Sequence, residues 1–206
     1  MPFIDNNFKI TAPIQAKRIL MTTADESPIY QEMESLAHFL KNQEQHILCV
    51  DGDLGNGLKE NDALNKVLQD KGAIPKAVQK THHLAVLGGK SNQTLAQSSD
   101  SFKMQFLADL QLYEEQFDHV IVAIGSHNTQ LQELWLKWTN TTFLFFKNEN
   151  LSLERTANFL TKYSHKINGL IGISKNLHET RLAWMRLRKI IPETPDLILD
   201  IKKIAL

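Results

Sequence analysis

The sequence predicts an α/β fold, a three-layer sandwich with a mostly parallel central sheet. Short apolar runs alternate with amphipathic stretches along almost the whole chain of 206 residues, which is the order of strands and helices in parallel-sheet proteins. The runs are apolar throughout, as expected for strands that helices cover on both faces. With 42% hydrophobic residues, the chain can bury the core of one domain of this size.

Six apolar runs predict the strands, each five or six residues long and rich in Ile, Val, Leu and Phe. The first of them, 18–23, ends in two threonines that precede an acidic turn. In a parallel sheet the turns that follow the strands lie at one edge, where ligands bind. The strands are expected at 18–23, 46–51, 83–87, 119–124, 142–146 and 168–173.

Helical spacing of apolar residues predicts the helices between these strands. The first has apolar side chains three and four residues apart, with Ser27 expected as N-cap and Pro28 at the first helical position. Residues 1–16 form an N-terminal arm in this interpretation, and 17–206 form one domain. The apolar positions of the first helix are Ile29, Met33, Leu36, Ala37 and Leu40, and the other helices are expected at 61–69, 100–116, 129–139, 153–164 and 178–191.

Composition narrows the class of protein further. The chain has 23 basic and 23 acidic side chains and a pI near 7.1, so no bulk field draws it to nucleic acid or an anionic membrane. Cys49 is its one cysteine, which excludes an internal disulfide and a cysteine-rich metal site. The first ten residues lack the pattern of a signal peptide, and no apolar run approaches the roughly 20 residues of a membrane span. We therefore expect a cytoplasmic protein.

The turn after the second predicted strand carries the most specific motif. It reads Asp51-Gly52-Asp53-Leu54-Gly55, two carboxylates at a strand end followed by glycine. This segment resembles the D-x-D-L-G segment of the MinD and ParA family of P-loop ATPases, which includes the FlhG regulators of flagellar number.

Three further segments, in the same order as in that family, support the resemblance over about residues 17–191. LAVLGGK at 84–90 and YEEQFDHVIVAIG at 113–125 are similar to the stretch that leads into the Walker B strand. Glu149, Ser152 and Leu153 match the family's P-E-P-T-S-L turn. The resemblance implies a P-loop NTPase fold with the nucleotide site in the turn after the first strand.

That turn departs from the family pattern. A P-loop needs glycines, whose backbone N–H groups wrap the phosphates, and a lysine. The matching residues 23–30 contain neither, and Asp25 and Glu26 stand where phosphates would bind. A helix N-terminus attracts anions, so we expect Asp25, Glu26 and the Ser27 hydroxyl to satisfy the next helix from within the chain.

Two other strand ends depart as well. Ala123 stands where the family has its Walker B carboxylate, two residues before Gly125, and Ser174 stands at the family's base-reading asparagine. Asp51 and Asp53 remain at the switch positions that the family associates with magnesium and the attacking water. The sequence therefore predicts a vestigial nucleotide site with no catalytic residue, cofactor or metal, made up of Asp25, Glu26, Ser27, Asp51, Asp53, Gly55, Ala123, Gly125 and Ser174.

The distribution of charge supports this interpretation. Residues 25–62 hold nine acidic and two basic side chains, a net charge of −7, and the remainder holds 14 acidic and 21 basic side chains, a net charge of +7. The acidic stretch is the one that would surround a triphosphate, which it would repel.

Two C-terminal segments each allow two interpretations. The helix at 178–191 is basic and could contact DNA, as in ParA-like relatives, or an acidic partner. We favour a solvated basic face above an apolar face formed by Leu182, Trp184 and Met185. Residues 195–206 favour a last strand, with an amphipathic membrane-contacting helix, as in MinD-like proteins, as the alternative.

Together these features predict a non-hydrolysing MinD/ParA/FlhG-like adaptor or scaffold, and they favour a pseudo-ATPase over an active enzyme. By resemblance, its partner is another protein: an active relative, a second copy in a homodimer, or a component of a flagellum, pilus, secretion or division machinery. We expect no nucleic-acid partner, and recruitment to the inner membrane or cell pole is an option. The alternative function is a divergent ATPase or capsule-type bacterial tyrosine kinase that still binds nucleotide; a receiver-like signalling domain ranks last.

Overall fold

The computed structural model describes residues 17–25, 29–42, 44–54, 61–69, 72–81, 84–91, 93–126, 128–173 and 176–198. Within them, eight strands form one sheet in the order β4-β5-β2-β6-β1-β7-β8-β9. All neighbours are parallel except β4 and β5. The strands are β1 Arg18–Thr23, β2 Ile47–Asp51, β4 Val78–Thr81, β5 Leu84–Leu87, β6 His119–Ile124, β7 Thr141–Phe146, β8 Gly169–Gly172 and β9 Leu197–Ile198.

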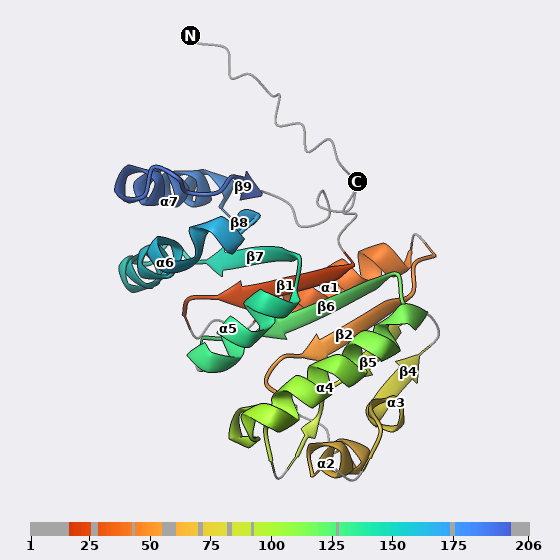
Figure 1. Cartoon of the computed structure of the whole chain (residues 1–206). Helices are drawn as coiled ribbons and strands as arrows, with labels where there is room; N and C mark the ends of the chain where they lie inside the picture. The colour runs from red at the N-terminus through yellow and green to blue at the C-terminus, as the bar shows by residue number, and fades with distance from the viewer. Residues whose placement is uncertain are drawn as a thin grey trace.

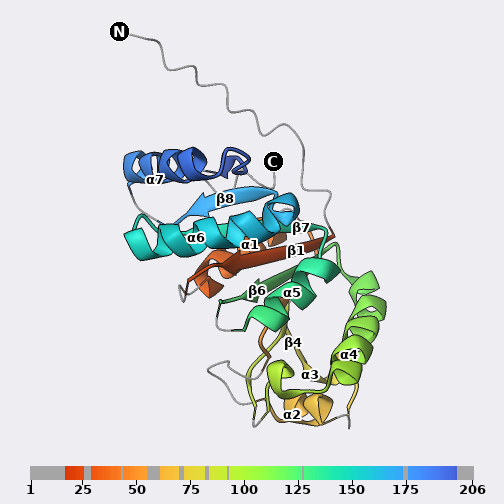
Figure 2. The same ribbon diagram turned by 60° about the vertical axis from the view of Figure 1, so that its left-hand side comes forward.

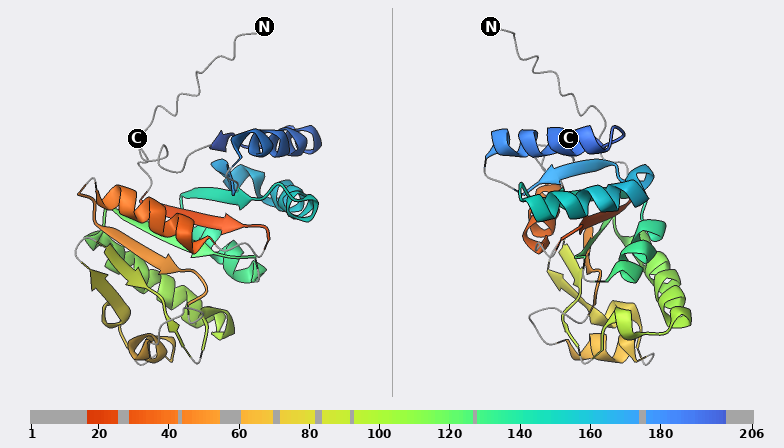
Figure 3. Two further views of the ribbon diagram at one scale, coloured as in Figure 1. Left: turned by 180° about the vertical axis from the view of Figure 1, so that it is seen from behind. Right: turned by 90° about the vertical axis from the view of Figure 1, so that its left-hand side faces the viewer.

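Helices cover both faces of the sheet, which confirms the predicted three-layer α/β fold. Figure 1 shows α4 and α5 in front of the strands, and the reverse view in Figure 3 shows α1 in front of them. The helices are α1 Tyr30–Lys41, α2 Asp62–Leu68, α3 Ile74–Ala77, α4 Asp100–Tyr113, α5 Thr129–Trp138, α6 Asn150–Tyr163 and α7 Leu177–Ile190, with 3₁₀ turns η1 Leu95–Gln97, η2 Glu114–Gln116 and η3 Ser164–Lys166.

Two hydrophobic clusters form the core, one on each side of the sheet. Alternate strand residues divide between them, because successive side chains point to opposite faces. On β2, Leu48 and Val50 join the larger cluster, whereas Ile47 and Cys49 join the smaller one beneath α1. Ala123 of β6 also belongs to the smaller cluster and faces α1.

Side-chain caps fix the starts of several helices. Asn61 accepts a 3.0 Å hydrogen bond from the amide of Leu64 at the start of α2, and Asn128 accepts one of the same length from the amide of Leu131 in α5. The start of α1 differs from the prediction. Its N-cap is Ile29, which makes no side-chain cap hydrogen bond, and the predicted cap at Ser27 and Pro28 lies outside the described residues.

The C-terminal end of the described chain is a strand. Leu197 and Ile198 pair in parallel with Leu170 and Ile171 of β8, as the strand interpretation of this segment predicts, and residues 199–206 lie outside the described part. No helix in the described ranges is long and apolar enough to cross a membrane.

Candidate functional site

The carboxyl ends of β1, β2 and β6 meet at one edge of the sheet. There Ala123 of β6 pairs with Asp51 of β2 on one side and with Met21 of β1 on the other. Asp25 follows two residues after β1. Five of the predicted site residues are described, namely Asp25, Asp51, Asp53, Ala123 and Gly125; Glu26, Ser27, Gly55 and Ser174 lie outside the described residues.

Asp25 is buried at this edge and is held by hydroxyl groups. The Thr23 hydroxyl donates to Asp25 Oδ1 at 2.8 Å, and the Asp25 amide donates back to Thr23 Oγ1 at 3.1 Å. On the other side, the Ser152 hydroxyl of α6 donates to Oδ2 at 2.5 Å. Ser152 Oγ also accepts from the amide of Lys147 at 3.0 Å. The carboxylate therefore joins the turn after β1 to the first turn of α6.

Asp51 is the centre of a second cluster, between β2 and α1. The Tyr30 hydroxyl donates to Asp51 Oδ1 at 2.8 Å, and the amide of Asp53 donates to the same oxygen at 3.2 Å. Both aspartates are buried, with 7% and 2% of their surface exposed. Burial raises the pKa of Tyr30 well above its usual range, and the nearby charges of Asp51 and Asp53 raise it further. The tyrosine therefore stays a neutral hydrogen-bond donor.

Close backbone packing fixes the position of Asp51. A Cβ atom at Gly88 would lie 2.9 Å from the Cβ of Asp51, a separation that real Cβ atoms do not show. Only glycine at position 88, just after β5, leaves room for the aspartate. The sequence motif around Asp51 therefore depends on a glycine 37 positions further along the chain.

Gly52, which lies within the same motif, is in contact with the indole of Trp135. The indole N–H of Trp135 donates to the carbonyl of Gly52 at 2.8 Å, and the Gly52 amide donates to the carbonyl of Ala123 at 2.8 Å. A Cβ at Gly52 would lie 2.9 Å from the Cβ of Ile124. The turn after β2 is thus packed directly against β6 and α5.

Gln132 of α5 ties that helix to the end of β1. Its amide nitrogen donates to the hydroxyl of Thr22 at 3.0 Å and to the carbonyl of Thr23 at 2.9 Å. Thr22 in turn donates to the carbonyl of Ile124 at 3.0 Å. Gln132 is buried, so these bonds form away from water, where they contribute most.

Three members of this site, Tyr30, Gln132 and Trp135, were not predicted from the sequence. A signal existed for Gln132, because it lies on the buried face of α5 beside Leu131 and Trp135, and a polar side chain on an apolar helix face needs a partner. No local pattern marks Tyr30, whose partner lies 21 residues away.

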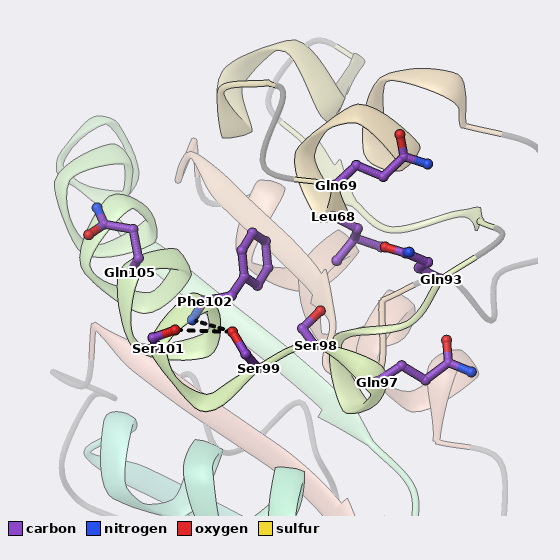
Figure 4. Close-up of a pocket in the computed structure, with 9 residues that line it drawn as sticks. All are labelled: Leu68, Gln69, Gln93, Gln97, Ser98, Ser99, Ser101, Phe102 and Gln105. Atoms are coloured by element: carbon purple, nitrogen blue, oxygen red, sulfur yellow. Dashed lines mark hydrogen bonds between the residues drawn. The ribbon is translucent and has the colours of Figure 1, made fainter.

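Two cavities lie near helix ends. One of about 440 Å³ lies between α5 and α6 and is lined by Arg155, Lys162 and the ring of Tyr163, among others. The other, of about 860 Å³, lies between α2 and the start of α4 (Figure 4). Four glutamines and three serines line it with Leu68 and Phe102, and none of its described lining residues is charged. Its chemistry is that of neutral hydrogen bonding and differs from that of a phosphate site.

The structure corrects one prediction about the basic C-terminal helix. Leu182 and Met185, expected to face the core, are 46% and 52% exposed. The buried side chains of α7 are Thr180, Ala183 and Leu187, and Trp184 is half-buried against the larger cluster. Apolar residues therefore occupy the outer face of this helix together with its arginines.

Comparisons with known proteins identify the fold class. No protein-family model matches the sequence, and no curated protein matches it either. Solved structures do match. The ParA family ATPase of Chlorobium tepidum superposes with a TM-score of 0.61 at 15% identity, over 90% of this chain and 85% of that one. The cell division protein MinD of Aquifex aeolicus superposes with a TM-score of 0.66 at 12% identity, over 89% of this chain and 81% of that one.

Cobyrinic acid a,c-diamide synthase of Mycobacterium smegmatis, solved with a bound ATP analogue and magnesium, is similar to the same extent. It gives a TM-score of 0.64 at 16% identity, over 91% of both chains. The fold is thus that of the MinD and ParA type of P-loop ATPases, as the motifs predicted. At such low identity the likeness shows the fold alone.

Proposed function

We propose that this chain is a non-hydrolysing relative of the MinD/ParA-type ATPases that acts as an adaptor or scaffold. It works through contacts with other proteins in positioning or assembling a cell-envelope apparatus such as a flagellum, a pilus, or secretion or division machinery. In this proposal the sheet and helices provide a fixed frame, and the nucleotide site is vestigial.

The observation that carries the proposal is the position of Asp25. Its buried carboxylate lies in the turn between β1 and α1 and is held by the hydroxyls of Thr23 and Ser152. A phosphate oxygen about 4 Å from this carboxylate would meet a repulsion of about 4 kcal/mol at the partly buried edge of the sheet. That alone lowers affinity by about three orders of magnitude.

The magnesium that accompanies ATP also finds a poor set of ligands among the described residues. Magnesium takes near-octahedral oxygen ligands, with carboxylates and phosphates foremost. Asp51 Oδ1 already accepts from Tyr30 and from the amide of Asp53, and the neighbouring Ala123 has no oxygen in its side chain. These contacts favour a site that is complete without nucleotide.

A protein partner fits this fold. MinD of Aquifex aeolicus has been solved in complex with MinC, and that structure superposes on this chain with a TM-score of 0.63 at 12% identity. A homodimer, or a pairing with an active relative, would use the same frame. The proposed location is the cytoplasm, with recruitment to the membrane or a cell pole through its partner.

Calorimetric titration with Mg-ATP tests the proposal. The protein should give no binding heat at submillimolar nucleotide. Excess Mg-ATP should also leave its Tm unchanged, whereas a ligand present at a hundred times its Kd would add about 2.7 kcal/mol of stability and raise the Tm. Binding that Asp51→Ala abolishes would overturn the proposal. Phosphotyrosine formed on the purified protein with Mg-ATP would instead support the kinase alternative.

Affinity purification from the native cell, followed by mass spectrometry, tests the adaptor role. Co-purification of a flagellar, pilus, secretion or division component, or of an active relative, supports it. If polysaccharide enzymes alone were recovered, the adaptor role in positioning would have to be replaced.

A further inference from the structure

The outer face of α7 combines exposed apolar side chains with basic ones. His178, Leu182, Met185 and Lys189 follow one another at intervals of four, three and four residues, which places them on one stripe of the helix. All four are exposed, and Leu182 and Met185 at the centre of the stripe are 46% and 52% exposed. The stripe points away from the core cluster that contains Ala183 and Leu187.

Tight packing beneath α7 holds this orientation. A Cβ atom at Gly172 of β8 would lie 2.2 Å from Cγ2 of Thr180, so the helix approaches the strand as closely as glycine allows. Rotating the helix to bury Leu182 or Met185 would drive a larger side chain into that space. Figure 2 shows α7 beside α6, which flanks it on the sheet.

Basic side chains flank the apolar stripe on both edges. Arg181 and Arg188, seven residues apart, follow one edge, and Arg186 follows the other. Two of these guanidinium groups are oriented by neighbours. Arg186 donates to Oδ1 of Asn150 at 3.0 Å, and Arg188 lies 5.2 Å from the ring centroid of Trp184. With Lys189 and one acid, Glu179, the helix has a net charge of +3.

From this arrangement we infer that α7 is a docking surface for an acidic amphipathic helix of a partner protein. The inference rests on the proposed adaptor function, since it names the chemistry of a partner. Apolar side chains of the incoming helix, three or four residues apart, pack on Leu182 and Met185. Its flanking Asp and Glu side chains pair with Arg181, Arg188 and Arg186, whose planar groups match carboxylates.

Other occupants fit these observations less well. In a membrane, the half-exposed side chains of Leu182 and Met185 would bury less apolar surface than one acyl chain does. A single acyl chain gives only marginal membrane binding. Nucleic acid would neutralise the arginines but would leave Leu182 and Met185 without apolar contacts. A second copy packed through α7 about a two-fold axis would place arginine against arginine.

Selection from a peptide library tests the inference. The library consists of helical peptides of about 14 residues, or four turns, displayed on phage. The positions that would pack on Leu182 and Met185, here called the seam, carry Leu, Ala or Gln, and the flanking positions carry Glu, Lys or Gln. The full-length protein should enrich Leu at the seam and Glu at the flanks. The selected peptide should bind at least tenfold more weakly to the variant Leu182→Gln/Met185→Gln than to the wild-type protein. The separate variant Arg181→Glu/Lys189→Glu should lose at least as much affinity.

A matched control exists on α4, where Met104 and Leu112 are 62% and 70% exposed. Met104→Gln/Leu112→Gln should leave the affinity unchanged. Enrichment of Lys flanks, absence of enrichment, or equal binding to all variants would overturn the inference, as would binding to vesicles of anionic phospholipid in place of the peptides. If the protein bound Mg-ATP and also selected acidic helices, the proposed function would be overturned, whereas the docking surface on α7 would be supported.

Discussion

The hydroxyl of Tyr30 in α1 donates a 2.8 Å hydrogen bond to Asp51 at the end of β2. The bond joins the first helix to the most family-like motif of the chain. It places a neutral donor from within the protein on a buried carboxylate. The bond is therefore a sensitive point at which to test how the site is stabilised.

Tyr30→Phe should lower the free energy of unfolding by about 1 to 2 kcal/mol, because a buried carboxylate loses one of its donors. Urea denaturation at neutral pH measures the change. Tyr163→Phe is the matched control, since that hydroxyl bonds to Glu133, whose side chain is 38% exposed, and its loss should stay under about 1 kcal/mol. Equal losses in the two variants would contradict the assignment.

Alkaline pH should destabilise the protein through two side chains, Tyr30 and Cys49, whose pKa is higher in the folded state. Burial raises the pKa of Tyr30, and burial together with the charge of Glu34 raises the pKa of the Cys49 thiol to about 12. Each group binds its proton more tightly when folded, so its contribution is complete below the unfolded pKa, about 8.5 for Cys and 10 for Tyr. That contribution falls as pH rises above those values.

Denaturation curves at a series of pH values between about 8 and 11 measure this loss. Between about pH 10 and 11, where an unfolded tyrosine ionises, Tyr30→Phe should lose less stability than the wild-type protein. A profile for Tyr30→Phe that parallels the wild type through this interval would show that Tyr30 does not carry the effect.

Asp25 and Ser152 should be energetically coupled. Each of Asp25→Ala and Ser152→Ala should cost about 1.5 to 3 kcal/mol, since a hydrogen bond to a charged group is lost. The double variant should cost less than the sum, with a coupling energy of about 0.5 to 3 kcal/mol. Thermal or urea unfolding of the four proteins gives the cycle, and strict additivity would argue against the contact.

Arg18 and Glu114 form a nearly buried pair with two parallel contacts, at 2.8 and 2.6 Å, and the guanidinium lies 4.5 Å from the ring centroid of Trp138. Arg18→Met should cost about 3 kcal/mol or more, because Glu114 is left charged in a buried place. Arg18→Met/Glu114→Leu should recover much of that loss.

The pair between Lys162 and Glu133 provides the exposed comparison, with side chains 61% and 38% exposed. Lys162→Met should lower the free energy of unfolding far less than Arg18→Met, because solvent screens an exposed pair. Equal effects at the two sites would contradict the difference in burial.

Local sequence patterns predicted the elements well, because the period of apolar residues is a local property. The strands at 18–23 and 119–124 begin and end at the predicted residues, and the helix at 100–116 is α4 followed by η2. α6 begins at Asn150, three residues before its predicted start. The short helix α3 and the antiparallel edge strand β4 were missed, since Ile74–Ala77 and Val78–Thr81 are too brief to show a period.

The site was predictable in position and much less so in its contacts. The motifs placed Asp25, Asp51 and Ala123 at one sheet edge, as observed. The hydroxyl of Ser152 on Asp25 comes from 127 residues away, and such a pairing depends on the completed topology. The exposure of Leu182 and Met185 was missed for a similar reason, because which face of α7 is buried depends on how closely Thr180 approaches Gly172.

The indole of Trp135, hydrogen-bonded to the carbonyl of Gly52, gives the chain a reporter at the site itself. The fluorescence of a buried indole changes when its surroundings change, so any loosening of the turn after β2 should shift the emission of this tryptophan. A protein that switches needs two conformations of the same elements. The fluorescence of Trp135 can therefore show whether this protein populates a second conformation of the turn after β2.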